Sequence, residues 1–312
     1  MSDLIKIAVD AMGGDGSPKK IIDGIIHHYK KNNSTFYKIF GDQEKISKFI
    51  SNSLNKDTFE IIHTNETVEG TDTPLAAAKR GKNTSMWMAI DSVKNKEADV
   101  IISAGNTGAL FVIAKLNLKM IENIDKPALS GLWPTKRGMS VVLDLGANIE
   151  CSEKNLVDFS IMGASLLKSL YPDEFPKVAL LNIGSEEFKG NETIKNAGTM
   201  MQSSSLNYGG YVEGDDIFEG NYDVIVTDGF TGNIALKTGE GTATLVRTLF
   251  KETFTNSILA KIASFLAFKS LKNLRKRIDP RRVNGGVFLG LNGTIVKSHG
   301  GADAIGICAA IT

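Results

Sequence analysis

The stretch Lys6-Ile-Ala-Val-Asp-Ala-Met-Gly-Gly-Asp-Gly16 decides the fold of this 312-residue chain. Its first half is a short, mostly apolar run with a β-branched core, and its second half is rich in glycine, which together predict a buried strand that ends in a tight turn. Ser17 and Pro18 follow as the expected cap and first position of a helix. A strand, a turn and a helix in this order form the first unit of an α/β fold.

The same alternation of short β-branched runs and longer helical stretches continues along the chain. The strands that we expect are Lys6–Asp10, Tyr37–Gly41, Phe59–His63, Val100–Ser103, Met139–Asp144, Lys177–Asn182 and Tyr222–Thr227. The pattern predicts an α/β protein with a doubly wound, largely parallel sheet. Composition shifts only weakly near 123–127 and 203–214, so residues 1–312 are expected to form a single domain.

Five of these strands lead into loops that are rich in Gly, Asp or Asn. The loops are Asp10–Gly16, Ser103–Gly108, Asp144–Asn148, Asn182–Glu192 and Thr227–Asn233. In a parallel sheet such loops lie at the carboxyl edge, where α/β proteins bind ligands, so they predict a shared polar crevice. Turns between strands and helices also need glycine for structural reasons alone, which is the alternative for any single loop.

The glycine-rich loops are suited to anions, because glycine lets backbone amides approach a ligand and a helix N-terminus adds partial positive charge. Neither a phosphate-loop motif nor a dinucleotide fingerprint is present. The candidate phosphate- or substrate-binding residues are Asp10, Gly13, Gly14, Asp15, Gly105, Asn106, Thr107, Gly108, Asp144, Asn148, Asp228 and His299. The structural alternatives stay open: aspartates at strand ends bond turn amides, asparagines cap helices, and a histidine in a turn holds that turn.

Lys189 and Asn233 stand out beside the later loops. Lys189 lies in a flexible loop before a helix, where a cation can reach a bound anion, and its alternative is a solvated surface lysine. Asn233 lies at or near a helix start, where a capping role is the alternative to ligand contact.

Other kinds of site are not indicated. Cys151 and Cys308 give no disulfide framework, and no cluster of His, Cys and carboxylates has metal-ligand spacing, so no metal or cofactor is expected. The net charge of +1 does not suit a nucleic-acid-binding surface. The apolar runs are far shorter than a membrane span and a strand begins within a few residues of Met1, which predicts a cytoplasmic protein with at most peripheral membrane contact.

Residues 256–282 form an unusual segment that is apolar first and basic afterwards. An apolar stripe that ends near Leu266 loses its register beyond that point, which favours a bend or two short helices. Such a segment can contact anionic lipid, an acidic protein or a second subunit. The candidate contact residues are Ile262, Phe265, Leu266, Lys269, Lys272 and Arg275.

These motifs together resemble the PlsX family of phosphate acyltransferases. The similarity is carried by Ile7–Asp15, Ser103–Ala109, Leu143–Asn148, Lys189–Glu192 and Thr227–Asn233, and it runs in order through nearly the whole chain. One departure is Gly16, where many members carry His or Phe, so no catalytic role is assigned to that side chain.

The resemblance implies transfer of a fatty acyl group from acyl carrier protein to inorganic phosphate, giving acyl phosphate for phospholipid synthesis. It implies a fold similar to the isocitrate and isopropylmalate dehydrogenases and the phosphotransacetylases. It also implies a homodimer, peripheral membrane association and a functional link to a membrane glycerol-3-phosphate acyltransferase. The family's proposed catalytic lysine and asparagine fall on Lys189 and Asn233.

Other functions remain open at this point. A nicotinamide-dependent decarboxylating dehydrogenase has a related fold, and a phosphotransacetylase differs only in using acyl-CoA. A membrane-surface scaffold that recruits acyl carrier protein through 269–282 is the non-enzymatic alternative.

Overall fold

A computed structural model describes residues 4–50, 53–172, 175–277 and 279–312, which contain one mixed sheet flanked by helices. The strands are β1 (Ile5–Asp10), β2 (Thr35–Gly41), β3 (Phe59–His63), β4 (Val100–Ser103), β5 (Ala128–Pro134), β6 (Met139–Leu143), β7 (Lys177–Leu181), β8 (Asn207–Val212), β9 (Val224–Val226), β10 (Gly286–Leu289) and β11 (Thr294–Lys297). The helices are α1 (Lys19–Tyr29), α2 (Gln43–Ser47), α3 (Pro74–Arg80), α4 (Ser85–Lys94), α5 (Thr107–Leu118), α6 (Glu153–Leu170), α7 (Glu192–Gln202), α8 (Gly229–Thr255), α9 (Ile258–Leu266), α10 (Phe268–Arg277) and α11 (Ala304–Ile311).

The sheet has the strand order β3-β2-β1-β4-β11-β10-β5-β6-β9-β7-β8. Strands β3, β2, β1, β4 and β11 are mutually parallel, and so are β6, β9, β7 and β8. Between the two groups, β10 is antiparallel to both β11 and β5, and β5 is antiparallel to β6. The predicted largely parallel α/β sheet is confirmed, but the two groups run in opposite directions.

This reversal makes the expectation of one shared carboxyl edge wrong. The loops after β1 and β4 leave one edge of the sheet, whereas those after β6, β7 and β9 leave the opposite edge. Three successive antiparallel pairings in the middle of the sheet are the physical cause. The loops therefore form two groups that leave the sheet in opposite directions. The ends of β11 and β6 are nevertheless level, because Val296 pairs with Val287, Val287 with Ser130, and Ser130 with Leu143.

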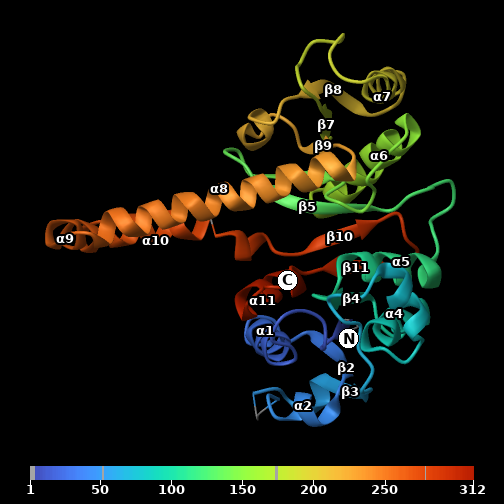
Figure 1. Ribbon diagram of the computed structural model, residues 1–312, viewed down its shortest axis with the longest axis vertical. Coiled ribbons are helices and arrows are strands. Elements are labelled where there is room, and N and C mark those ends of the chain that lie inside the picture. The colour runs from blue at the N-terminus through green and yellow to red at the C-terminus, as the bar shows by residue number, and fades with distance from the viewer. Residues whose placement is uncertain (1–3, 51–52, 173–174, 278) are drawn as a thin grey trace.

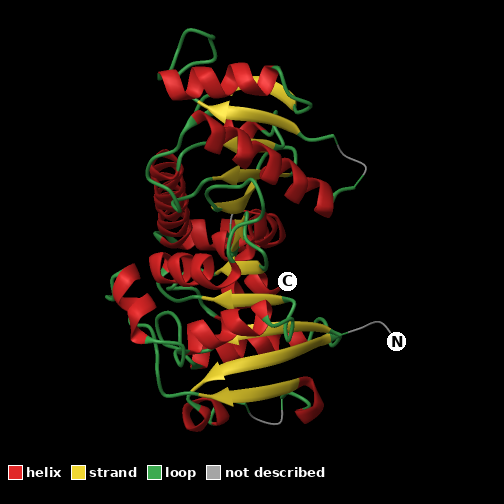
Figure 2. Ribbon diagram, turned by 90° about the vertical axis from the view of Figure 1, so that its right-hand side faces the viewer, coloured by secondary structure: helices red, strands yellow, loops and turns green. Residues whose placement is uncertain are grey.

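Helices cover both faces of the sheet, as the predicted doubly wound arrangement requires (Figure 2). In the first group of strands, Ile7 and Val9 pack in the cluster that holds residues of α1 and α11, while Ala8 packs in the cluster of α4 and α5. Alternate residues of one strand thus serve opposite layers. In the second group, α6 and α7 cover one face and the first turns of α8 lie on the other.

All the predicted strands are present, with ends that differ by up to two residues. β5, β8, β10 and β11 were not predicted. The expected helix after the first loop is present, but its cap is not Ser17: α1 begins at Lys19 after Pro18, and the Ser17 hydroxyl donates instead to the carbonyl of Gly13. The first turn of the helix is therefore tied back to the glycine-rich loop.

Helices α8, α9 and α10 form an arm that projects from the sheet (Figure 1). α8 extends for 27 residues, and α9 and α10 follow it at the far end, with the chain bending at Ala267. The predicted pair of short helices in this segment is confirmed. Within the part of the chain that is described, no helix is long and apolar enough to cross a membrane.

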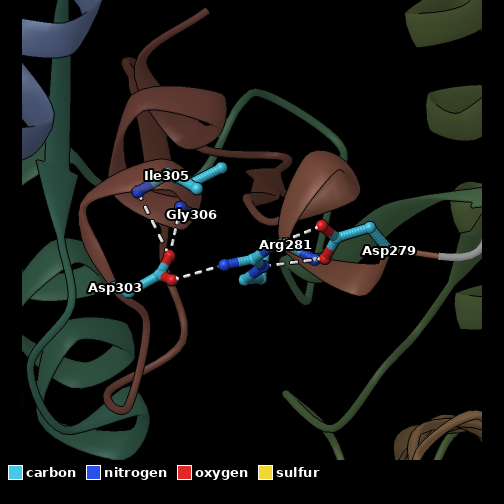
Figure 3. A network of polar contacts seen from close by, with 5 residues as sticks. All are labelled: Asp279, Arg281, Asp303, Ile305 and Gly306. Carbon is cyan, nitrogen blue, oxygen red and sulfur yellow. Dashed lines mark hydrogen bonds and ion pairs between the residues drawn. The ribbon is translucent and has the colours of Figure 1, made fainter. Parts of the chain in front are cut away.

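An ion-pair network fastens the chain where it returns from the arm (Figure 3). The guanidinium of Arg281 contacts the carboxylates of Asp279 and Asp303, each at 2.7 Å. Asp303 caps α11 by accepting from the N–H groups of Ile305 and Gly306. Although partial burial acts to raise it, these bonds hold the pKa of Asp303 below its ordinary value. Arg281, in the basic part of the segment, is thus engaged within the protein.

The contact between α1 and α11 yields a stability prediction. A β-carbon on Gly24 would lie 2.4 Å from Cγ2 and 2.5 Å from Cβ of Ile307, so the helices would have to separate. Gly24→Ala should destabilise the protein by about 1–3 kcal/mol, outweighing the gain of about 1 kcal/mol from helix propensity. Gly70→Ala, where no atom lies within 4 Å, is the control. Thermal unfolding measures both, and equal stability of Gly24→Ala and wild type would contradict the packing argument.

Candidate active site

Asp10, at the end of β1, organises the first group of loops. Its side chain is 1% exposed and accepts from the hydroxyls of Ser85 and Ser103, each at 2.7 Å. It also accepts from the backbone N–H groups of Met12 and Gly13. Burial raises the pKa of Asp10, while these donors act in the opposite direction. The carboxylate oxygens of Asp10 already accept hydrogen bonds inside the protein. Asp10 therefore holds the loops in place and does not contact a ligand directly.

Glycines let the loops of this group approach each other closely. A β-carbon on Gly13 would lie 2.6 Å from the backbone nitrogen of Gly105, and one on Gly14 would lie 2.9 Å from the carbonyl oxygen of Gly300. Gly14 has φ +88°, a conformation that favours glycine. The N–H of Asp15 donates to the carbonyl of Gly300 at 2.9 Å, which joins the first loop to the turn after β11.

His299 lies in that same turn and holds it in shape. Its Nδ1 accepts from the N–H of Gly301 at 3.1 Å, and its own N–H donates to Asn284. His299 therefore holds its own turn, the structural role that the sequence left open for it. Its ring lies beside the loop that carries Asp15.

The start of α5 supplies the rest of the first group. Asn106 caps the helix by accepting from the N–H of Ala109, and its amide donates to the carbonyls of Gly70 and Asp72. Thr107 and Gly108 form the first helical positions and are half-buried. Asn106 thus has a structural role, and the first-turn amides of α5 are the groups that a ligand can reach.

The second group is built around Asp144, which is fully buried after β6. It accepts from the N–H groups of Leu129, Gly146, Ala147 and Asn148 and from the side-chain amide of Asn148. Burial raises the pKa of Asp144, although these hydrogen bonds act to lower it. Asn148 is also buried and donates to Pro127. Neither side chain is open to a ligand, so both act on the loop.

Helix α8 starts against this loop and presents Asn233. Asp228, not Asn233, is the cap, because its carboxylate accepts from the N–H and hydroxyl of Thr231. Asn233 is exposed on the next turn, and its side chain makes no hydrogen bond within the described residues. A β-carbon on Gly146 would lie 3.3 Å from Cβ of Asn233, which places the amide beside the Asp144 loop.

Lys189 lies in the loop between β7 and α7. This loop belongs to the same parallel group of strands as the turn after β9 from which α8 and Asn233 follow. The backbone carbonyl of Lys189 accepts from the buried Asn182 at 3.2 Å, which fixes the loop to the end of β7. Its side chain is 40% exposed and lies 3.9 Å from Glu186, too far for a tight ion pair. The ammonium is therefore available to an incoming anion.

The sequence reasoning missed Lys297, the last residue of β11. It is half-buried. Burial, followed by repulsion from Lys237, lowers its pKa to about 8, while attraction to Asp10 opposes the shift. β11 was not predicted as a strand. The available signal was the β-branched run Thr294–Val296, which directly precedes Lys297.

No group of three or more His, Cys, Asp or Glu side chains suited to a metal occurs among the described residues. Cys151 is half-buried, and burial together with the carboxylate of Asp144 raises the pKa of its thiol to about 11. A thiol with so high a pKa is a poor nucleophile. Among the described residues beside these loops, the polar groups left open include backbone amides and the side chains of Lys189 and Asn233.

The fold is that of the phosphotransacylases. A phosphotransacetylase from Streptococcus pyogenes matches with a TM-score of 0.64 at 16% identity, covering 100% of this chain and 93% of that one. The EutD phosphotransacetylase from Staphylococcus aureus matches with a TM-score of 0.61 at 14% identity, covering 98% and 91%. At such identities the similarity shows the fold alone.

Comparison of sequences identifies the family, which the similarity of fold alone does not. Residues 5–312 match the family model FA_synthesis, described as "Fatty acid synthesis protein". The "Phosphate acyltransferase" of Pelagibacter ubique (strain HTCC1062) is 64% identical over 309 residues, covering 98% of this chain and 92% of the relative. That of Maricaulis maris (strain MCS10) is 45% identical over 317 residues, covering 100% and 90%. The chain belongs to this family, the PlsX family of phosphate acyltransferases, and is an enzyme that transfers an acyl group to phosphate.

The contact between α8 and the Asp144 loop yields a prediction about activity. A β-carbon on Gly232 would lie 1.9 Å from the carbonyl oxygen of Asp144, so Gly232→Ala must displace α8 and with it Asn233. Misplacing a substrate-positioning group by about 1 Å can cost about a hundredfold in rate, and a loss of that size in acyl phosphate formation is expected. Gly239→Ala on the same helix, whose nearest neighbour lies at 3.8 Å, should stay close to wild type. Equal rates for the two variants would contradict the assigned position of Asn233.

Proposed function

We propose that the acyl donor is acyl carrier protein carrying a fatty acyl thioester, and that the acyl phosphate formed serves phospholipid synthesis. The observation that carries the proposal is the pairing of glycine-rich anion loops with two side chains that have no tight internal partner, Lys189 and Asn233, in a chain of this family. The family description, "Fatty acid synthesis protein", fits a fatty acyl substrate.

In the proposed reaction a phosphate oxygen attacks the thioester carbonyl carbon, a C–O bond forms, and the C–S bond breaks. The carrier leaves as a thiolate that takes a proton from water. Because phosphate is already anionic and a thiolate leaves readily, the reaction needs positioning and charge stabilisation more than a strong base. Within the Gly13–Asp15 and Gly105–Gly108 loops, the amides of Gly14 and of the first turn of α5 bind phosphate. Lys189 neutralises the charge that develops, and Asn233 donates to the oxyanion.

Replacing either side chain should remove most of the activity. Lys189→Met and Asn233→Ala are each expected to lower kcat for acyl phosphate formation about a hundredfold or more, the usual effect of losing one oxyanion donor. Lys195→Met is the matched control, because that lysine is exposed to a similar degree but pairs with Glu192 on the helix surface.

The assay uses acyl carrier protein and acyl-CoA thioesters in parallel with inorganic phosphate. A higher kcat/KM with the carrier protein supports the proposed donor, and a preference for acyl-CoA would reject it. Activity of Lys189→Met close to that of the Lys195→Met control would reject the role of Lys189.

We further propose that the arm carries two contact surfaces, one for a second copy of the chain and one for the membrane. Along α8, exposed apolar side chains recur at helical spacing, as in Leu245 and Leu249 or Val246 and Phe250. A continuous apolar stripe on a projecting helix suits a symmetric helical contact, so we assign it to a homodimer.

The far end of the arm suits anionic lipid. Phe265 and Leu266 are each 80% exposed, Ile262 is 52% exposed, and Lys269 and Lys272 follow on α10. An apolar tip beside lysines binds a bilayer surface peripherally, with the charges drawn to acidic headgroups. The Arg275 side chain, predicted to contribute, lies outside the described residues. Membrane contact through this tip would bring a cytoplasmic enzyme to the place where a membrane glycerol-3-phosphate acyltransferase consumes its product, which is part of the proposal.

Two variants separate the surfaces. The double variant Phe265→Asp, Leu266→Asp should lose binding to phosphatidylglycerol vesicles, because it removes the apolar tip and adds negative charge, while its oligomeric state stays unchanged. Leu249→Asp should dissociate the dimer, because it places a charge in the stripe. Vesicle sedimentation and analytical ultracentrifugation measure the two effects. Unchanged vesicle binding by the double variant would reject the membrane surface, and an unchanged mass for Leu249→Asp would reject the dimer stripe.

A further inference from the structure

The loop that carries Lys189, residues 183–190, is closed at its base by one buried side chain. Asn182 is 8% exposed at the end of β7, and its amide oxygen accepts from the N–H of Ile183 at 2.9 Å. Its amide nitrogen donates to the carbonyl of Lys189 at 3.2 Å. Because a single amide group holds both the beginning and the end of the loop, the loop has a defined shape without a helix or strand of its own.

Two glycines let the loop pack against its own side chains. Gly190 has φ +90°, and a β-carbon on it would collide with the amide oxygen of Asn182. Gly184 is buried, and a β-carbon on it would lie 2.9 Å from Cγ of Lys189. The aliphatic stem of Lys189 therefore lies on Gly184, which fixes the path of the lysine side chain along the loop.

Two large apolar side chains of this loop face solvent. Ile183 is 78% exposed, and Phe188 is 74% exposed. The ammonium nitrogen of Lys189 lies 5.9 Å from the ring centroid of Phe188. Ile183 directly precedes Gly184, on which the stem of Lys189 lies. The two apolar residues thus border the side chain of the proposed catalytic lysine.

Apolar side chains held in water by a closed loop indicate a binding surface. Within the folded chain they gain little from burial, and apolar groups that gather at one place on a protein surface commonly mark a contact with a ligand or partner. Sites for small molecules combine apolar walls with a few polar groups that fix orientation. The ring of Phe188 beside the ammonium of Lys189 provides both kinds of group at one point.

The charge of the loop distinguishes between possible occupants. Glu186 and Glu187 are exposed on the same loop, so it carries two carboxylates and one ammonium. Acidic headgroups and acidic protein surfaces are repelled by such a loop, whereas an uncharged hydrocarbon chain is not. The loop follows β7, which lies well away from α9 at the tip of the arm (Figure 1). The occupant that fits is therefore a neutral apolar group and not the membrane that the tip suits.

We infer that Ile183 and Phe188 bind the hydrocarbon chain of the acyl group, next to the thioester on which Lys189 acts. This inference rests on the proposed function, from which the role of Lys189 is taken, and it deepens that function by naming the residues that contact the chain. The hydrocarbon chain begins at the carbonyl carbon, so the groups that bind it must adjoin those that bind the carbonyl. Phe188 meets this requirement through its position beside the ammonium.

The test is the double variant Ile183→Ser, Phe188→Ser, measured with butanoyl and hexadecanoyl thioesters of the same carrier. The ratio of kcat/KM for hexadecanoyl to that for butanoyl should fall about tenfold to a hundredfold, the range for losing the burial of a large apolar side chain. Loss of the loop structure alone would lower both rates alike and leave the ratio unchanged. An unchanged ratio would overturn the inference.

Phe175→Ser is the matched control, because Phe175 is 70% exposed and precedes β7, at the opposite end of that strand from Ile183. It should leave the ratio at the wild-type value, and a fall as large as that of the double variant would contradict a local chain site. The double variant should keep the mass and the vesicle binding of wild type. Loss of either would assign the pair to a second copy or to the membrane and reject the chain site.

Calorimetric titration with dodecyl phosphate and ethyl phosphate tests the site without turnover, since neither ligand can transfer an acyl group. Wild type should bind dodecyl phosphate at least tenfold more tightly than ethyl phosphate, and the double variant should lose this preference. That outcome supports the chain site even if wild type transfers no acyl group from carrier protein. Acyl transfer by wild type, together with an undiminished preference for dodecyl phosphate in the double variant, rejects the chain site alone.

Discussion

Two buried aspartates, Asp10 and Asp144, hold the loops on which the rest of the site depends. A carboxylate taken out of water must be satisfied by donors, and each of these recruits the amides of the glycine-rich loop that follows it. The first also gathers two serine hydroxyls from α4 and β4. The backbone of each loop is thereby fixed before any ligand binds, which is what preorganised amide donors require.

The reversal of strand direction at β10 and β5 determines how these two centres work together. It turns the two sets of loops in opposite directions, while the pairing through Val287 and Ser130 keeps Val296 of β11 level with Leu143 of β6. α8 starts against the Asp144 loop and carries Asn233 beside it, so the position of this side chain depends on how the loop is held.

Local features were predictable from sequence, and relative placement was not. The runs before Asp10, Asp144 and Thr227 predicted strands, because β-branched residues followed by glycine report on local structure. β10 and β11 are short and flanked by glycine, and without them the sequence indicated a largely parallel sheet with one carboxyl edge. Strand direction depends on pairing between distant segments, so the single shared edge could not be tested from the sequence.

The same limit applies to individual site residues. Lys189 and Asn233 were recognised because their surroundings are distinctive, and the structure leaves both without a tight internal partner. Asp10 and Asp144 were recognised too, but their burial, and hence their role in the loops, depends on tertiary contacts. Lys297 is an ordinary lysine in sequence, and only the register of three strands makes it a neighbour of Ser103.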